Sequence, residues 1–112
     1  MSEVQVMSLE NDEGVWVYDM KPTLDNLQNA VNGMIEMVPV MPGVAMWVNE
    51  EGLMRESTMN VYASLLASVA RFSATTIMGK ALLTGIDEQG EVIGLTDDQV
   101  EHLKGVCGIE EL

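Results

Sequence analysis

Basic residues are scarce in this sequence, and their shortage limits the partners that the chain can bind. Five Lys and Arg residues stand against 18 Asp and Glu residues, which gives a formal net charge of −13 at pH 7. Because this charge repels phosphates and anionic lipid headgroups, we expect no direct contact with nucleic acid or with a membrane. The acidity serves solubility alone or steers the chain towards a protein with a basic surface.

Cysteine and long apolar runs are also nearly absent. The single cysteine, Cys107, excludes an intramolecular disulfide and the disulfide-rich secreted class, and it fits a reducing compartment. The acidic segment 1–14 has no apolar stretch typical of a signal peptide, and no apolar run is long enough to cross a bilayer. We therefore predict a soluble, cytoplasmic protein.

The chain lacks the groups on which most catalytic and metal sites depend. His102 is its only histidine, and we expect it on the exposed side of a C-terminal helix. Cys107 has no second Cys and no His at ligand spacing, and no phosphate-binding, dinucleotide-binding or zinc-protease motif occurs. These absences predict a protein that is not an enzyme and has no catalytic residues, no cofactor and no metal site.

The sequence does contain a clear succession of strand and helix patterns. Residues 4–9 and 14–20 are rich in β-branched and aromatic residues around a polar connection, which predicts a hairpin. A helix is predicted within residues 21–33, because Thr23 is a suitable N-cap and Asn32 followed by glycine is a typical stop. Leu24, Leu27 and Val31 are expected on one face of that helix.

The middle of the chain repeats this succession. Alternating apolar residues between 34 and 49 predict two strands, with Pro39 and Pro42 at an edge or in a connection. A second helix follows, for which Ser57 or Thr58 is the expected N-cap. Its apolar stripe is expected to comprise Val61, Leu65, Leu66 and Val69.

The last third has the same form. Two strands are predicted within residues 75–95, around the turn at 87–90, and a helix over 96–105 with Thr96 and Gln99 as a capping box. Residues 105–112 are expected to form a peripheral tail. Together the patterns predict a single α+β domain over residues 1–112, with a mainly antiparallel sheet and about three helices packed on it.

Three acidic tetrads are evenly spaced along the chain. NDEG, NEEG and DEQG begin at Asn11, Asn49 and Asp87, each 38 residues after the previous one. Either the chain contains a loose internal repeat of hairpin and helix, or the spacing is coincidental, because turns everywhere use the same few residues.

The carboxylate pair Glu50-Glu51 in the second tetrad first raises the question of acid/base chemistry. Neighbouring side chains in a strand face opposite sides, and in a tight turn both face water, so neither carboxylate is desolvated in the way that acid/base catalysis requires. We therefore interpret Asn49–Gly52 as a hairpin turn. In this interpretation the Asn49 side chain forms an Asx-type turn, and Gly52 adopts a positive φ.

Several motifs in order resemble a small domain-of-unknown-function family of phages, plasmids and bacteria, number three-eight-four-six. The stretches that carry the resemblance are TLDNLQNAVNGMIEMV, VAMWVNEEGLM, MNVYASLLA and IMGKALLTG, within residues 23–95. The matching residues are Leu27, Gln28, Val31, Gly33, Ile35 and Glu36 in the first block, Asn49–Gly52 in the second, Asn60 and Ala63 in the third, and Gly79 in the last. Asn32 replaces a glycine of the family pattern, and Met34 stands where an aromatic residue is common.

The resemblance implies an origin in a phage or mobile element and action in a bacterial host cytoplasm, with no reaction to carry over. It also marks Glu36 and Asn60 as polar residues at family positions beside apolar segments. We expect their side chains to reach Asn49–Gly52 and to fasten strand, turn and helix together.

Three functions remain open at this point. The first is a non-enzymatic accessory protein that binds and modulates a host protein with a basic surface, such as a defence or nucleic-acid enzyme, through Asn49–Gly52, Asn60 and the neighbouring arginines. The second is an oligomeric binder of a nucleotide signal that uses Arg55 and Arg71 for phosphate contacts. The third is an assembly protein with exposed methionines at an interface, although we expect most of the ten methionines to fill the core.

Overall fold

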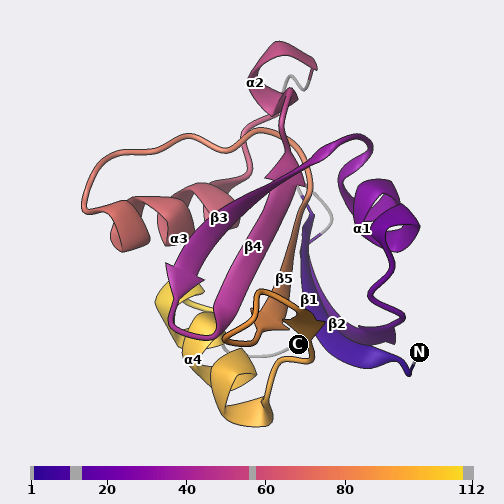
Figure 1. Cartoon of the computed structure of the whole chain (residues 1–112). Helices are drawn as coiled ribbons and strands as arrows, with labels where there is room; N and C mark the ends of the chain where they lie inside the picture. The colour runs from indigo at the N-terminus through magenta and orange to yellow at the C-terminus, as the bar shows by residue number, and fades with distance from the viewer. Residues whose placement is uncertain (1, 11–13, 56–57, 110–112) are drawn as a thin grey trace.

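The sheet has six strands, all paired antiparallel, in the computed structural model, which describes residues 2–10, 14–55 and 58–109 and only the backbone of Arg55. The strands are β1 (Val4–Glu10), β2 (Gly14–Met20), β3 (Ile35–Met41), β4 (Val44–Asn49), β5 (Ala81–Ile86) and β6 (Val92–Ile93). Five strands lie in the order β2-β1-β5-β4-β3, and β6 extends the sheet by pairing with the end of β5 (Figure 1). β2 and β3 are therefore edge strands.

Four helices surround this sheet: α1 (Leu24–Val31), α2 (Gly52–Arg55), α3 (Val61–Arg71) and α4 (Asp97–Cys107). α1 lies on one face of the sheet, and α3 and α4 lie on the other (Figure 1). The predicted α+β class is confirmed, and the one-turn helix α2 comes in addition to the three helices expected. In the part of the chain that the structure describes, no helix has the length and apolarity needed to cross a membrane.

The strands bury residues on both faces because each face has its own helical cover. Val6 and Leu82 point towards Leu27 of α1, whereas the adjacent Met7 and Leu83 belong to the larger core beneath α3 and α4. Alternation of side chains along a strand produces this division. Burying such a side chain stabilises the fold by about 1.5–3 kcal/mol.

Methionines fill only part of this core. Met7 and Met46 are fully buried, but Met34, Met37, Met54 and Met59 are among the exposed large apolar residues. Core filling thus explains some of the methionine content, and the others lie on the surface.

Hairpin and helix do alternate three times, as β1-β2-α1, β3-β4 with α2 and α3, and β5-β6-α4. DEQG occupies the connection between β5 and β6, and Gly90 there has a φ of +83°. NDEG falls mostly outside the described residues. NEEG, however, follows the second hairpin, whose own turn lies at Pro42-Gly43. The equal spacing of the tetrads therefore does not mark equivalent places in three structural units.

Pro39 and the predicted caps of α1 and α4 lie where the sequence patterns place them. Pro39 lies in the edge strand β3 beside a register shift, where a missing N–H is tolerated. Thr23 accepts a hydrogen bond from the Asn26 N–H at 3.2 Å, and Asn32 ends α1 with a φ of 61°. The capping box of Thr96 with Gln99 is also present, and the exposed position of His102 agrees with its expected place on α4.

The predictions for α3 were wrong in two respects. Thr58 is not its N-cap and Ser57 lies outside the described residues, whereas the Asn60 side chain accepts from the Ala63 N–H at 3.0 Å. The expected stripe is mostly turned outwards, because only Leu66 of its four members is buried. The buried face consists of Ala63, Ser64, Leu66 and Ala67.

The helix α4 continues beyond the predicted end at Lys104-Gly105. It ends at Cys107 and is capped by Gly108 with a φ of 73°. Val106 and Cys107 pack against the large core, so the first part of the expected peripheral tail is integral to the domain. Residues 110–112 lie outside the described residues.

Burial raises the pKa of the Cys107 thiol to about 11, because the thiolate loses hydration. We expect iodoacetamide to alkylate folded protein at pH 8 at least about tenfold more slowly than urea-unfolded protein. Stability should also fall as the pH rises from the ordinary thiol pKa towards 11, since only the unfolded thiol ionises readily there. Mass spectrometry against time and pH measures the first effect. Equal alkylation rates in the two states would contradict the burial of Cys107.

Candidate functional site

The turn Asn49–Gly52 connects a strand to a helix, so its interpretation as a hairpin tip was wrong. It leads from β4 into α2. The Asx-type turn is confirmed, because Asn49 Oδ1 accepts a hydrogen bond from the Glu51 N–H at 2.8 Å. Gly52 does not have a positive φ. Position 52 needs a glycine for close packing instead, since a Cβ atom there would lie 2.8 Å from the Met78 carbonyl oxygen.

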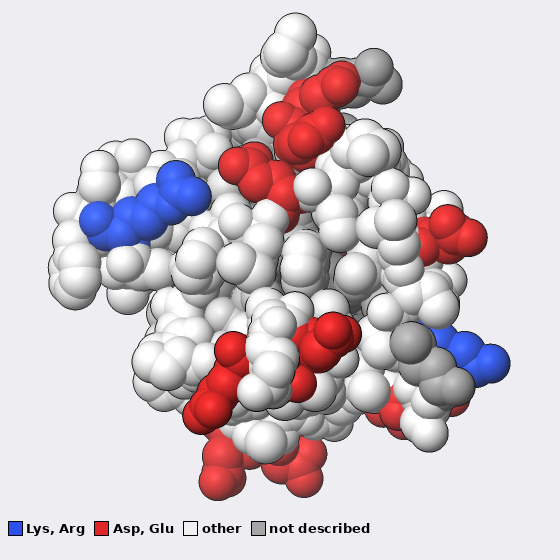
Figure 2. Space-filling model, viewed as in Figure 1, with Lys and Arg blue, Asp and Glu red and all other residues white. Residues whose placement is uncertain are grey.

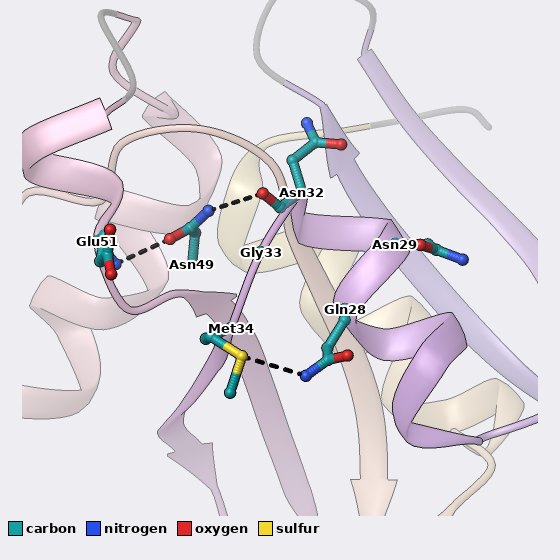
Figure 3. Close-up of a pocket in the computed structure, with 7 residues that line it drawn as sticks. All are labelled: Gln28, Asn29, Asn32, Gly33, Met34, Asn49 and Glu51. Atoms are coloured by element: carbon teal, nitrogen blue, oxygen red, sulfur yellow. Dashed lines mark hydrogen bonds between the residues drawn. The ribbon is translucent and has the colours of Figure 1, made fainter.

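Asn49 also joins this turn to the end of α1. Its Nδ2 atom donates to the carbonyl oxygens of Val31 and Asn32, both at 3.2 Å. Figure 3 shows the bond to Asn32. A Cβ on Gly33 would lie 2.6 Å from that same Nδ2 atom. These short distances explain why glycine follows the helix and why Asn49, which is only 6% exposed, ends β4. The amide satisfies helix carbonyls that have no partner within the helix.

A hollow of about 390 Å³ opens beside this junction. Its lining includes Gln28, Asn29 and Met34, and Gln28 Nε2 lies 3.4 Å from the Met34 sulfur (Figure 3). Figure 3 shows the side chains of Asn29 and Asn32 pointing away from Asn49. Amides dominate this hollow, and none of the described residues that line it is basic.

A larger groove of about 570 Å³ lies on the other side of the Asn49–Gly52 turn. Its apolar lining includes Val38, Val48 and Ile77, each of which is at most 9% exposed. The opposite wall is the irregular segment 73–78 between α3 and β5. The groove thus combines an apolar base with a wall that offers backbone groups.

Two carboxylates and one guanidinium lie on the rim of this groove. Glu36 is exposed and lies directly opposite Val48 in the β3–β4 ladder. Glu50 is also exposed, and its N–H donates to the Met34 carbonyl oxygen at 2.9 Å. Arg71 at the end of α3 lines the groove as well. The described residues that line the groove accordingly carry both signs of charge, with two carboxylates against one guanidinium.

Lys80 and Lys104 are not among the described residues that line this groove. Lys80 pairs with Glu10 at 3.3 Å, and Lys104 pairs with Glu101 at 3.2 Å. Arg55 ends α2, and its side chain lies outside the described part of the chain, so its expected place beside Arg71 stays a prediction. Figure 2 shows acidic side chains gathered near the β4–α2 turn and again over α4, while basic side chains are few and scattered.

The expected bridge from Glu36 and Asn60 to Asn49–Gly52 was wrong for Asn60. Its Nδ2 atom donates to the carbonyl oxygens of Leu9 and Gly79, both at 2.8 Å. Asn60 is fully buried, so the structure gives it an internal role rather than a place on a contact surface. Glu36 does lie near the turn, because it shares the groove with Glu50 and Gly52.

Sequence patterns did not point to the wall at 73–78. The strand predicted from Thr75 begins only at Ala81 as β5, so that prediction was wrong for 75–80. The role of the segment depends on the chain passing beside the end of β4. Its backbone is held by Ser64 and Ser68, whose hydroxyls bond to Ile77 and Thr75. Serines on the buried side of an otherwise apolar helix are the one signal that could have indicated an adjoining irregular segment.

Among the described residues, no group of three or more His, Cys, Asp or Glu side chains is placed to hold a metal ion. The site therefore consists of the Asn49–Gly52 turn and the groove beside it. The chemistry that it offers is charge, hydrogen bonding and apolar contact.

Comparison with known proteins identifies the fold's family. No curated protein and no solved structure matches the chain. A family model described as "Domain of unknown function (DUF3846)" matches residues 4–107, a wider span than the 23–95 over which the motifs resemble it. The match takes in every strand and helix from β1 to α4. The chain therefore belongs to this domain-of-unknown-function family.

Proposed function

We propose that this chain is a non-enzymatic binding protein that holds a basic segment of a partner protein in the groove beside Asn49–Gly52. The observation that carries the proposal is the combination of an apolar base, Val38, Val48 and Ile77, with the exposed carboxylates Glu36 and Glu50 on its rim. Lysine and arginine side chains have an apolar stem and a charged end, so they suit such a groove.

The charge of the whole molecule supports the same partner. A net charge of −13 attracts a basic protein over the distance of a Debye length, about 8 Å at physiological salt, and raises the association rate. The groove then provides the short-range contacts. A phage-type accessory protein that modulates a host enzyme in the bacterial cytoplasm is the role that we propose for this binding.

A nucleotide ligand has weaker support. Phosphate recognition requires several cations or converging N–H donors, and Arg71 is the only basic side chain among the described residues that line the groove. Glu36 and Glu50 would repel the phosphates. A nucleotide released by heating purified protein and detected by mass spectrometry would overturn this preference.

The proposal predicts a local effect of charge rather than a global one. Glu36→Gln with Glu50→Gln should weaken binding of a fluorescent peptide of alternating lysine and valine by roughly tenfold, since two charge contacts are lost. Glu88→Gln with Glu91→Gln is the matched control, because both residues are exposed and lie near β6. The control makes the same change in net charge and should weaken binding less than about twofold.

Fluorescence anisotropy at 50 and 150 mM salt measures both effects. Equal weakening by the two double variants would mean that only the overall charge matters, and the groove would lose its assignment. Affinity purification from an expressing bacterial lysate then identifies the natural partner. We expect a protein with a basic surface that the Glu36/Glu50 double variant no longer retains.

A further inference from the structure

The outward face of α3 is an apolar stripe that nothing in the chain covers among the described residues. Val61, Leu65 and Val69 are 61%, 39% and 53% exposed, and Phe72, which caps the helix, is 97% exposed. At about 100° per residue, the three helical positions fall within roughly 80° of one another around the helix. Val61, Leu65 and Val69 form one continuous ridge with a four-residue spacing. We call these three residues together with Phe72 the α3 stripe.

The α3 stripe lies in the one long part of the sequence without carboxylates. Residues 57–86 contain no Asp or Glu, although the whole chain has 18. Arg71 is the only charged residue of α3. In Figure 2, the surface formed by α3 shows a basic side chain and is otherwise uncoloured, in contrast to the acidic groups elsewhere on that face.

We propose that the α3 stripe is a self-association surface, on which α3 packs antiparallel against α3 of a second copy. A basic partner would be attracted to the carboxylates and would meet none here, only the cation of Arg71. In a two-fold pair the surface that meets the α3 stripe is the same face of the second copy. Residues 57–86 of that face contain no Asp or Glu, so the contact between them buries no carboxylate, and the acidic groups of both copies stay on the outer sides of the pair. The charge distribution thus favours a copy of this chain over a basic protein on this face.

The form of the stripe also suits a two-fold contact. In an isologous interface the same residues of both copies meet. An aliphatic ridge can pack against the same ridge of a second copy when the two helices run antiparallel. Ridges of four-residue spacing pack at a crossing angle of about −50°. Burial of apolar side chains of this size favours association, and this gain must exceed the entropic cost of bringing two chains together.

The contact should be weak, because it is short. An 11-residue helix is roughly 16 Å long, so one helix pair forms a small contact, whereas stable interfaces bury about 1,200–2,000 Å². We therefore expect a monomer–dimer equilibrium in the micromolar range. Since both copies carry a charge of −13, added salt should strengthen this association.

The direction of the salt effect separates this inference from the proposed function. Binding of a basic partner in the groove weakens as salt rises, whereas self-association through an apolar stripe between two acidic chains becomes stronger. Either one can fail while the other holds. The groove variants Glu36→Gln and Glu50→Gln remove repulsion between copies, so they should leave the dimer intact.

Sedimentation equilibrium of the full chain from 1 to 500 μM, at 50 and 500 mM NaCl, tests the inference. We expect a dimer that tightens with salt, and a Leu65→Glu variant that is at least tenfold weaker, because a carboxylate is then buried opposite its own copy. Leu24→Glu is the matched control: Leu24 is 58% exposed in the first turn of α1, where an acidic residue suits the helix N-terminus. It should dimerise like the unmodified chain.

Three results would overturn the inference. The first is a chain that stays monomeric at 500 μM in both salt concentrations. The second is a Leu65→Glu variant that is folded by circular dichroism and still dimerises as tightly as the unmodified chain. The third is a chain that stays monomeric while Leu65→Glu, and not Leu24→Glu, loses a foreign protein retained from a lysate. That result would assign the α3 stripe to a heterologous partner. If Leu65→Glu does not fold, Val61→Glu at the more exposed end of the helix replaces it.

Discussion

Asn60→Ala is expected to lower the free energy of unfolding by about 3–5 kcal/mol, the largest effect of any polar substitution that we predict. One side chain caps α3 through the Ala63 N–H and donates to two main-chain carbonyls, Leu9 in β1 and Gly79 before β5. Alanine leaves all three groups buried without this partner. Because small domains are stable by only about 5–15 kcal/mol, the variant should be close to unfolded at 37 °C.

Urea unfolding followed by circular dichroism measures this loss. Asn29→Ala is the control, since Asn29 is exposed in the middle of α1, where alanine is a better helix former. It should be neutral or slightly stabilising. Asn60→Asp keeps the capping oxygen but faces two carbonyl oxygens with a carboxylate, so it should not restore stability. A loss below 1 kcal/mol for Asn60→Ala would refute this role.

Asn49→Ala is expected to cost about 2–4 kcal/mol and to loosen the candidate site as well. The change removes the acceptor for the Glu51 N–H and both bonds to the end of α1, at Val31 and Asn32. It also opens space beside Gly33, whose α-carbon packs closely against the Asn49 amide. The groove wall formed by the turn should lose its fixed position, so peptide binding should weaken together with stability.

Hydrogen exchange of the Glu51 and Asn60 amides separates the local effect of Asn49→Ala from a global one. We expect exchange at Glu51 to accelerate more than exchange at Asn60, whose N–H donates to the Ile77 carbonyl oxygen inside the core. Asn49→Asp preserves the acceptor for Glu51 alone and should remain as unstable as Asn49→Ala. Full recovery in Asn49→Asp would show that the Asx-type turn, and not the contact with α1, stabilises this junction.

Local signals were sufficient for most of the secondary structure. The caps of α1 and α4 were predicted correctly from Thr23, Asn32 and the Thr96–Gln99 pair, because caps depend on residues within one turn of the helix end. The hairpins β1-β2 and β5-β6, the first and the last along the chain, were predicted from strand-forming residues on either side of polar connections. These features need no knowledge of what lies across the sheet.

The face of α3 could not be chosen from periodicity. Val61, Leu65 and Val69 are larger and more apolar than Ala63, Ser64 and Ala67, yet the smaller residues are the buried ones. A small face allows α3 to approach the sheet closely, and Ser64 bonds to the adjoining segment at Ile77. The result leaves an apolar stripe outside, which is the basis for the proposed self-association.

The turn at Asn49–Gly52 shows the same limit. Its composition favours a turn, and a turn is present, but whether a strand or a helix follows depends on the space around Gly52. The close approach of the Met78 carbonyl oxygen requires the glycine, and that contact joins residues far apart in the chain. No local pattern encodes it.

The amino-acid sequence alone determined the family, the α+β class, the acidity and the succession of hairpins and helices, because these depend on composition and on residues close together in the chain. Only the tertiary structure placed Asn60 between β1 and the approach to β5, brought Glu36 and Glu50 to one groove and turned the larger face of α3 outwards. Such placements depend on packing between distant segments, in which shape and hydrogen-bond satisfaction outweigh local hydrophobicity.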